Sequence, residues 1–204
     1  MPELASTIPE QFSSLLGLEG IAVACAIAYL LFAIRQNILC WLFAGISTAI
    51  YVYLFFEARL YMESALNVFY FAMAIYGWSV WRYSRVNRSE LAVAVWPPMR
   101  HAFAIAIILL ISGTSGYLLS TFTDAEYPYV DSLTTWAAIW ATFLVARKVL
   151  ENWWYWLLID AASVFIYWSR GLELTALLFV LYVIMIPFGL ISWRRSMIAP
   201  VTPA

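Results

Sequence analysis

The stretch Tyr76-Gly77-Trp78-Ser79-Val80-Trp81-Arg82 ends one apolar run of the chain. A similar stretch, Phe188-Gly189-Leu190-Ile191-Ser192-Trp193-Arg194, ends a later run. The offset that carries Gly77 to Gly189, called here the closing offset, also carries Leu66 to Leu178 and Tyr70 to Tyr182. A constant offset over several positions indicates an internal repeat.

The two copies also open alike. Asn37-Ile38-Leu39-Cys40-Trp41 opens one apolar run, and Asn152-Trp153-Trp154-Tyr155-Trp156 opens another. Aligning the two asparagines pairs Trp41 with Trp156, at an offset slightly longer than the closing offset. This alignment predicts that the middle connection of the second copy is three residues shorter than that of the first.

The composition places both copies in a membrane. The chain has 204 residues, of which 65% are hydrophobic and 11% are charged, and the mean hydropathy is +0.84. A soluble domain has about a quarter charged residues, enough to cover its surface with polar groups. So few charges exclude a water-soluble globule and predict a multi-pass membrane protein.

Seven runs are long enough to cross about 30 Å of hydrocarbon: residues 16–34, 38–56, 63–81, 101–121, 132–147, 152–169 and 174–193. The runs predict an all-α transmembrane fold in six parts: a periplasmic tail (1–15), a first three-helix repeat (16–81), a cytoplasmic loop (82–100), a linker helix (101–121), a second three-helix repeat (122–194) and a cytoplasmic tail (195–204). Three spans are an odd number, so the linker helix restores the direction of the second repeat. We therefore expect a 3+1+3 bundle of two parallel repeats, a plan used by transporters.

The positive charges predict the orientation. Nine of the eleven Lys and Arg residues fall in alternate connections, around Arg35, Arg82–Arg100, Arg147–Lys148 and Arg194–Arg195. Because cytoplasmic loops carry the excess of Lys and Arg, the amino terminus is predicted outside and the carboxyl terminus in the cytoplasm. The segment 1–16 holds no Lys or Arg, so the basic region of a signal peptide is missing.

The run Arg147-Lys148-Val149-Leu150-Glu151-Asn152-Trp153 with Trp156, preceded by Asp131-Ser132, closely resembles the PnuC family of vitamin transporters. The Tyr76-Gly77-Trp78 closing supports the resemblance, which covers about residues 17–194. The resemblance implies a plan like that of the SWEET sugar transporters. It also implies facilitated diffusion of a vitamin precursor across the bacterial inner membrane, most often nicotinamide riboside. The resemblance further implies that a cytoplasmic kinase phosphorylates the imported vitamin and so traps it in the cell.

Relatives of the PnuT type carry thiamine and others carry riboflavin, so the resemblance leaves the substrate open. The expected partners are a small cationic aromatic vitamin or nucleoside, the lipid bilayer and the kinase, with homo-oligomers possible and nucleic acid excluded. No cofactor is expected, and the single histidine, His101, cannot build a multi-histidine metal site. The sequence contains no recognisable motif of an intramembrane enzyme. A retinal receptor would need a lysine in the last span, whereas Lys148 is the only lysine. An ion-coupled symporter, using Asp160 or Asp131, remains an alternative.

Asp160 is the sharpest candidate for a binding residue. It lies near the middle of the sixth span, where a carboxylate costs at least about 2.5 kcal/mol to insert. It could be the counter-charge of a cationic ring or a structural hydrogen-bonding group. Trp153 and Trp156 share its helical stripe and could stack on an aromatic ring, or could simply pack. Asn152 and Trp153 also lie where a cytoplasmic gate would be.

Further candidates come from other spans. In the third span, Asn67 and Tyr70 share a face with Glu63. In the fifth, Trp136 and Trp140 are one helical turn apart and could either stack on substrate or pack in the core. Trp41, as the repeat counterpart of Trp156, is expected to approach the same axis from the other repeat. Gly113 and Gly116 of the fourth span are expected to permit close helix approach.

Overall fold

The computed structural model describes residues 3–57, 61–86, 91–123, 127–169 and 173–198. These residues form seven α-helices: α1 (Glu3–Ile34), α2 (Leu39–Glu57), α3 (Tyr61–Val86), α4 (Pro98–Phe122), α5 (Pro128–Ala146), α6 (Asn152–Ser169) and α7 (Glu173–Ile198). Each predicted span coincides with one helix. The main differences are that α1 begins at Glu3 instead of residue 16, that α5 begins at Pro128 instead of residue 132, and that α3 and α7 continue to Val86 and Ile198.

Within the described residues, four segments are long and apolar enough to cross a membrane: Gly17–Ile34, Leu39–Glu57, Pro98–Phe122 and Ala176–Ile198. The other three helices, α3, α5 and α6, have 26, 19 and 18 residues. At 1.5 Å per residue even the shortest spans about 27 Å. These three helices are long enough to cross the membrane, but their tryptophans, tyrosines and hydroxyl side chains lower their mean hydropathy below that of the other four.

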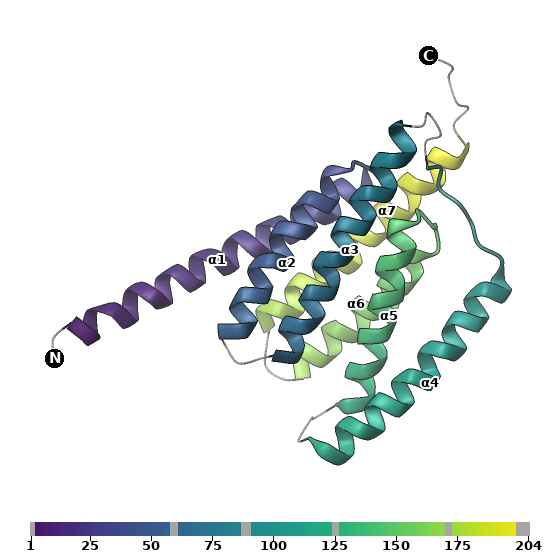
Figure 1. The fold of residues 1–204 in the computed structure, drawn as a ribbon. Coiled ribbons are helices and arrows are strands. Elements are labelled where there is room, and N and C mark those ends of the chain that lie inside the picture. Colours follow the sequence, from purple (N-terminus) through teal and green to yellow (C-terminus); the bar gives the residue numbers. More distant parts are fainter. Residues whose placement is uncertain (1–2, 58–60, 87–90, 124–126, 170–172, 199–204) are drawn as a thin grey trace. The chain divides into compact units, whose positions relative to one another are not determined.

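The chain divides into two compact units, residues 1–90 and 91–204. In the first unit, α2 packs against both α1 and α3, and Figure 1 shows the three helices in chain order. Buried hydroxyls join neighbouring helices: Ser47 donates to the carbonyl of Ala22 (2.8 Å), and Ser64 donates to the carbonyl of Val52 (2.9 Å). Each hydroxyl thereby gives its hydrogen a partner away from water.

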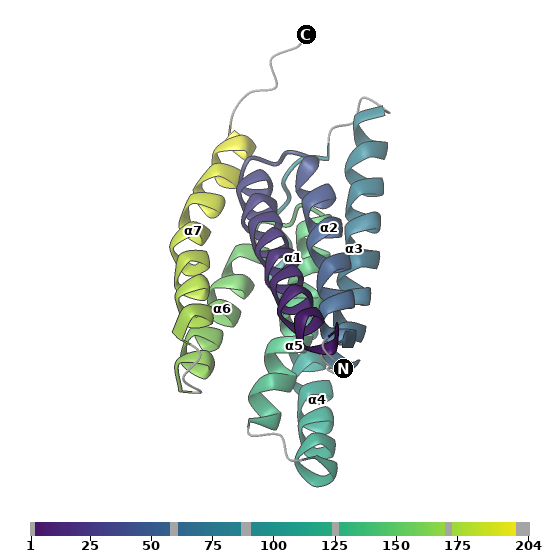
Figure 2. The ribbon, with the colours of Figure 1, turned by 90° about the vertical axis from the view of Figure 1, so that its left-hand side faces the viewer.

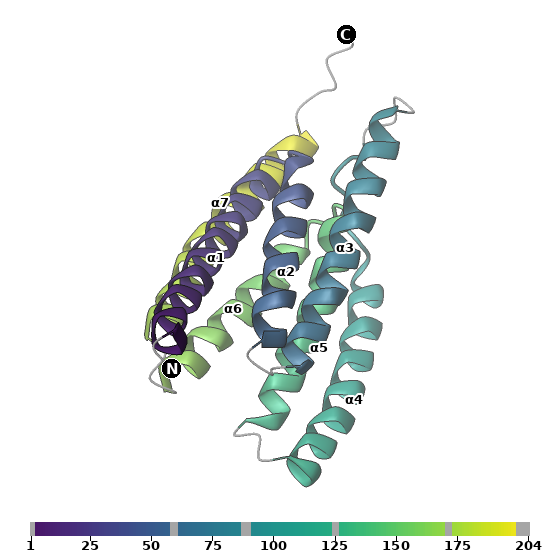
Figure 3. The ribbon, with the colours of Figure 1, turned by 60° about the vertical axis from the view of Figure 1, so that its left-hand side comes forward.

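In the second unit, α6 packs on α7 and on α5, and α5 also packs on α4 (Figures 2 and 3). A Cβ atom at Gly116 would lie 2.6 Å from the ring of Tyr129, so α4 and α5 approach closely there. The expectation for Gly116 is thus confirmed, whereas Gly113 faces open space. From this contact the two helices diverge toward the beginning of α4 (Figure 1).

The ends of α1 and α5 show the internal repeat in the backbone. Gln36 has a positive φ of 53°, its N–H donates to the carbonyl of Ala33 (3.0 Å), and the N–H of Asn37 donates to that of Phe32 (2.9 Å). Such a pair of bonds around a left-handed residue is a Schellman motif. The same motif recurs at the closing offset: Lys148 has φ 51°, Lys148 N–H donates to Val145 (3.0 Å), and Val149 N–H donates to Leu144 (2.9 Å).

A packing contact that we call the tryptophan wedge shows which residues of the two copies correspond. In it, one indole packs on a second indole and on a glycine of the neighbouring helix. Trp41 lies edge-on to Trp81, with ring centroids 5.6 Å apart and planes at 87°, and a Cβ at Gly77 would collide with its ring. In the other unit, Trp153 takes the same position on Trp193 (5.4 Å, 86°) and Gly189. Only a glycine leaves room for the indole between the helices.

Both the Schellman motif and the wedge recur at the closing offset. The prediction that pairs Asn37 with Asn152 and Trp41 with Trp156 is therefore wrong. The counterpart of Trp41 is Trp153, and Asn152 corresponds to Cys40. The alignment of the two copies is wrong because it matches the two asparagines. The correspondence is instead fixed by the tryptophan that packs against the glycine in each copy. The predicted three-residue shortening does not occur.

Candidate functional site

Helix α6 carries four of the predicted binding residues. Asn152 is its first residue and is fully buried, and its side-chain amide donates to the carbonyl of Val149 at 2.6 Å. Trp153 is 2% exposed and is held by the wedge with Trp193 and Gly189. These two side chains therefore anchor the start of α6 within the second unit.

Asp160 lies two turns into α6 and is 5% exposed. Among the described residues, no cation lies within ion-pair distance of its carboxyl group and no donor forms a hydrogen bond with it. Its counterpart in the first repeat is Thr48, whose hydroxyl donates to the carbonyl of Ala44 in its own helix at 2.8 Å. The acid is thus specific to the second repeat, and none of the described residues would compensate its charge when it is ionised.

Trp156 lies one turn before Asp160 and is half-buried. In the described part of the chain its ring stacks on no other aromatic ring, in contrast to Trp153. The adjacent Trp154 is 54% exposed and points elsewhere, as expected for a residue on another face. Trp156 thus leaves an indole face unused close to an uncompensated carboxyl group.

Trp136 and Trp140 both engage α4 or the segment before it. The indole N–H of Trp136 donates to the hydroxyl of Ser115 at 3.2 Å. The ring of Trp140 lies 6.1 Å from that of Trp96 and 5.5 Å from that of Phe143. The structure therefore gives Trp136 a structural partner and places Trp140 in an aromatic cluster beside the beginning of α4.

The remaining candidates lie in the first unit. Trp41 is 2% exposed and is occupied by the wedge with Trp81. Asn67 and Tyr70 are half-buried on α3, and the ring of Tyr70 lies 5.8 Å from that of Phe69. The side chain of Glu63 lies outside the described residues. These residues belong to a different unit from Asp160 and Trp156.

Sequence reasoning missed a polar cluster at the beginning of α4. His101 forms a hydrogen bond with the hydroxyl of Tyr155 (3.1 Å) and lies 3.8 Å from the carboxylate of Glu151. The same carboxylate accepts the backbone N–H of Trp96 at 3.3 Å. The segment before α4 reaches this position through a parallel bridge between Ala94 and Val149. The only sequence signal was a histidine and an acid at adjoining span edges, too little to pair them.

Known proteins with similar sequences cover nearly the whole chain. The family model described as "Nicotinamide mononucleotide transporter" matches residues 16–195. The nicotinamide riboside transporter PnuC of Escherichia coli K12 is 23% identical, over 88% of this chain and 85% of the relative. PnuC of Neisseria mucosa is also 23% identical, over 87% of this chain and 72% of the relative.

The fold agrees with these relatives. A crystal structure of the vitamin B3 transporter PnuC superposes with a TM-score of 0.70, covering 93% of this chain and 85% of that chain at 20% identity. The apolar helices fit a multi-pass protein of the bacterial inner membrane. The match of the family model over most of the sequence assigns the family: the chain belongs to the PnuC family of membrane transporters.

Proposed function

We propose that this protein takes up nicotinamide riboside across the bacterial inner membrane by facilitated diffusion, and that a cytoplasmic kinase traps the substrate by phosphorylation. Nicotinamide riboside is a flat aromatic ring with a fixed positive charge and a hydroxylated tail. A site for it needs an aromatic face for stacking and cation–π attraction. A nearby negative charge favours the cation over neutral solutes.

The observation that carries the proposal is the buried Asp160 on α6, one turn from the half-buried Trp156. A carboxylate inside a membrane protein is costly unless it has a partner, and the described residues supply none. A cationic substrate would be such a partner. Trp156 would supply the aromatic face, while the buried Asn152, Trp153 and Trp41 would hold the helices around the site in place.

We further propose that the two repeats run parallel about the linker helix α4, as a 3+1+3 bundle with the amino terminus periplasmic and the carboxyl terminus cytoplasmic. The recurrence of the Schellman motif and the tryptophan wedge at one offset supports two equivalent triplets. In this arrangement Asn67 and Tyr70 of the first repeat would face the same central path. Trp136 and Trp140 would stay on the α4 side.

Uptake into proteoliposomes tests the mechanism. At zero membrane potential, labelled nicotinamide riboside should enter until the inside and outside concentrations are equal, with no need for a proton or sodium gradient. Enclosing a nicotinamide riboside kinase and ATP should raise the total label far above that level. Accumulation of unmodified substrate under a proton or sodium gradient, with the membrane potential held at zero, would refute facilitated diffusion and favour a symporter that uses Asp160 or Asp131.

Thiamine is the second candidate, because it is also an aromatic cation and the acid would serve it equally well. Titrating the detergent-purified protein with each vitamin, followed by tryptophan fluorescence, separates the candidates. Nicotinamide riboside should bind more tightly than thiamine and riboflavin. Its phosphate should bind poorly, because a dianion would lie beside Asp160. Tighter binding of thiamine would reassign the substrate without changing the transport mechanism.

A further inference from the structure

The divergence of α4 from α5 leaves an open groove of about 310 Å³ within the second unit. Its lining comes from the segment before α4, the first three turns of α4 and one indole of α5: Trp96, Arg100, Phe103, Ala104, Ile107, Ile108 and Trp140. Except for Arg100, every lining side chain is hydrophobic or aromatic. A groove of this kind suits a hydrocarbon chain better than a polar vitamin.

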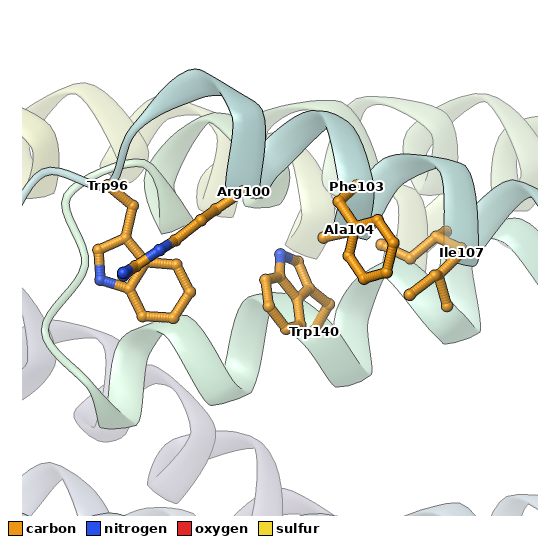
Figure 4. Close-up of a pocket in the computed structure, with 7 residues that line it drawn as sticks. Trp96, Arg100, Phe103, Ala104, Ile107 and Trp140 are labelled. Carbon is orange, nitrogen blue, oxygen red and sulfur yellow. The ribbon is translucent and has the colours of Figure 1, made fainter.

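The one charge in the lining lies at one end of the groove. The guanidinium of Arg100 lies over the ring of Trp96, 5.3 Å from its centroid, as Figure 4 shows. Phe103 and Ile107 continue along α4 from this point, with Trp140 facing them from α5 (Figure 4). The groove thus has a positive charge at one end and an apolar surface that continues from it along α4.

Arg100 is available for an anion. It is exposed, and among the described residues it forms no ion pair. Glu151, the acid nearby in the fold, is engaged by the backbone N–H of Trp96 and by His101. Arg100 lies in the first turn of α4, where the helix macrodipole also favours negative charge.

We propose that this groove binds an anionic glycerophospholipid. Its phosphate pairs with Arg100, and one acyl chain lies along Phe103, Ile107 and Trp140. The chain belongs to a family of membrane transporters, so lipid surrounds the protein and is the most abundant apolar ligand available to it. Basic residues at a membrane surface attract anionic lipids, and an arginine stacked on an indole is held ready for a phosphate oxygen. The groove is separate from Asp160 and Trp156, so the lipid site does not depend on the proposed substrate.

Native mass spectrometry in mixed micelles tests the site. The micelles contain phosphatidylglycerol and phosphatidylcholine with identical acyl chains, in equal amounts. The wild-type protein should retain phosphatidylglycerol about five-fold over phosphatidylcholine, the preference expected of one basic residue near the surface. Arg100→Gln should abolish this preference and Arg100→Lys should keep it. The matched control Arg195→Gln, an exposed arginine in the last turn of α7, should leave it unchanged.

The apolar part of the site is tested separately. Ile107 is 40% exposed, so Ile107→Trp can fill the groove without disturbing the core. This variant should lose retention of phosphatidylglycerol although it keeps Arg100. Free glycerol phosphate should not displace the lipid. Equal retention of both lipids by the wild type, retention by Ile107→Trp, or displacement by glycerol phosphate would overturn the proposal.

Discussion

The indole of Trp153 lies edge-on to that of Trp193, with ring centroids 5.4 Å apart and planes at 86°. The Trp153 ring also fills the space that a methyl group at Gly189 would need. The contact clamps the start of α6 to the end of α7. Trp41 and Trp81 repeat the arrangement in the first unit. In each unit the same tryptophan wedge therefore joins the start of one helix to the last turns of the next.

Gly189→Ala is expected to destabilise the protein. The added methyl group would overlap the Trp153 ring, and overpacking a buried contact typically costs about 1–3 kcal/mol. Thermal unfolding in detergent should show a lower melting temperature for Gly189→Ala and for Gly77→Ala. Gly113→Ala is the matched control, since a Cβ there meets nothing within 4 Å. A melting temperature as high in Gly189→Ala as in the control would contradict a stabilising role for the tryptophan wedge.

Lys148→Gly is expected to stabilise the turn between α5 and α6. A left-handed conformation costs a residue with a side chain about 1–2 kcal/mol, whereas glycine adopts it freely at a smaller entropic cost. The melting temperature should therefore rise slightly, and Lys148→Val should lower it. Arg147→Gly provides the comparison, because Arg147 has an ordinary φ of −91°. If glycine stabilised position 147 more than position 148, the assignment of the left-handed residue would be refuted.

The helices could be predicted because apolar length and charge placement are local properties. The run 152–169 coincides with α6, and the run 38–56 differs from α2 by one residue at each end. Charged side chains avoid hydrocarbon, so they mark the ends of spans directly. Helical extension beyond the hydrocarbon, as in α3 to Val86, leaves no such mark.

The register of the repeat could not be predicted from residue identity. Three tryptophans, Trp153, Trp154 and Trp156, compete as the counterpart of Trp41, and the asparagines favoured the wrong one. The counterpart is decided by which indole packs against a glycine of the next helix. The left-handed turns were also not recognisable in the sequence, because Gln36 and Lys148 occupy the position where a glycine is usual. The groove beside Arg100 was also unpredictable, because it depends on where α4 diverges from α5.

Trp156→Ala is expected to weaken the binding of nicotinamide riboside by about 10- to 100-fold, through loss of stacking and cation–π attraction. Fluorescence titration or calorimetry with the purified protein measures the change. Trp154→Ala is the control, since that side chain is 54% exposed on another face of the same helix. It should bind with nearly wild-type affinity. Equal affinities for the two variants would remove Trp156 from the site.

Asp160→Asn separates a counter-charge from a structural hydrogen-bonding group. The amide has almost the same shape but no charge, so the protein should become more stable to heat while its affinity for the cationic vitamin falls about ten-fold or more. Asp131→Asn, in the first turn of α5, should change neither property comparably. A neutral analogue with a reduced nicotinamide ring should bind to the wild-type protein and to Asp160→Asn with almost equal affinity. Should Asp160→Asn instead lower the melting temperature and leave the affinity for nicotinamide riboside intact, the carboxyl group would be structural, and the counter-charge would have to come from another residue.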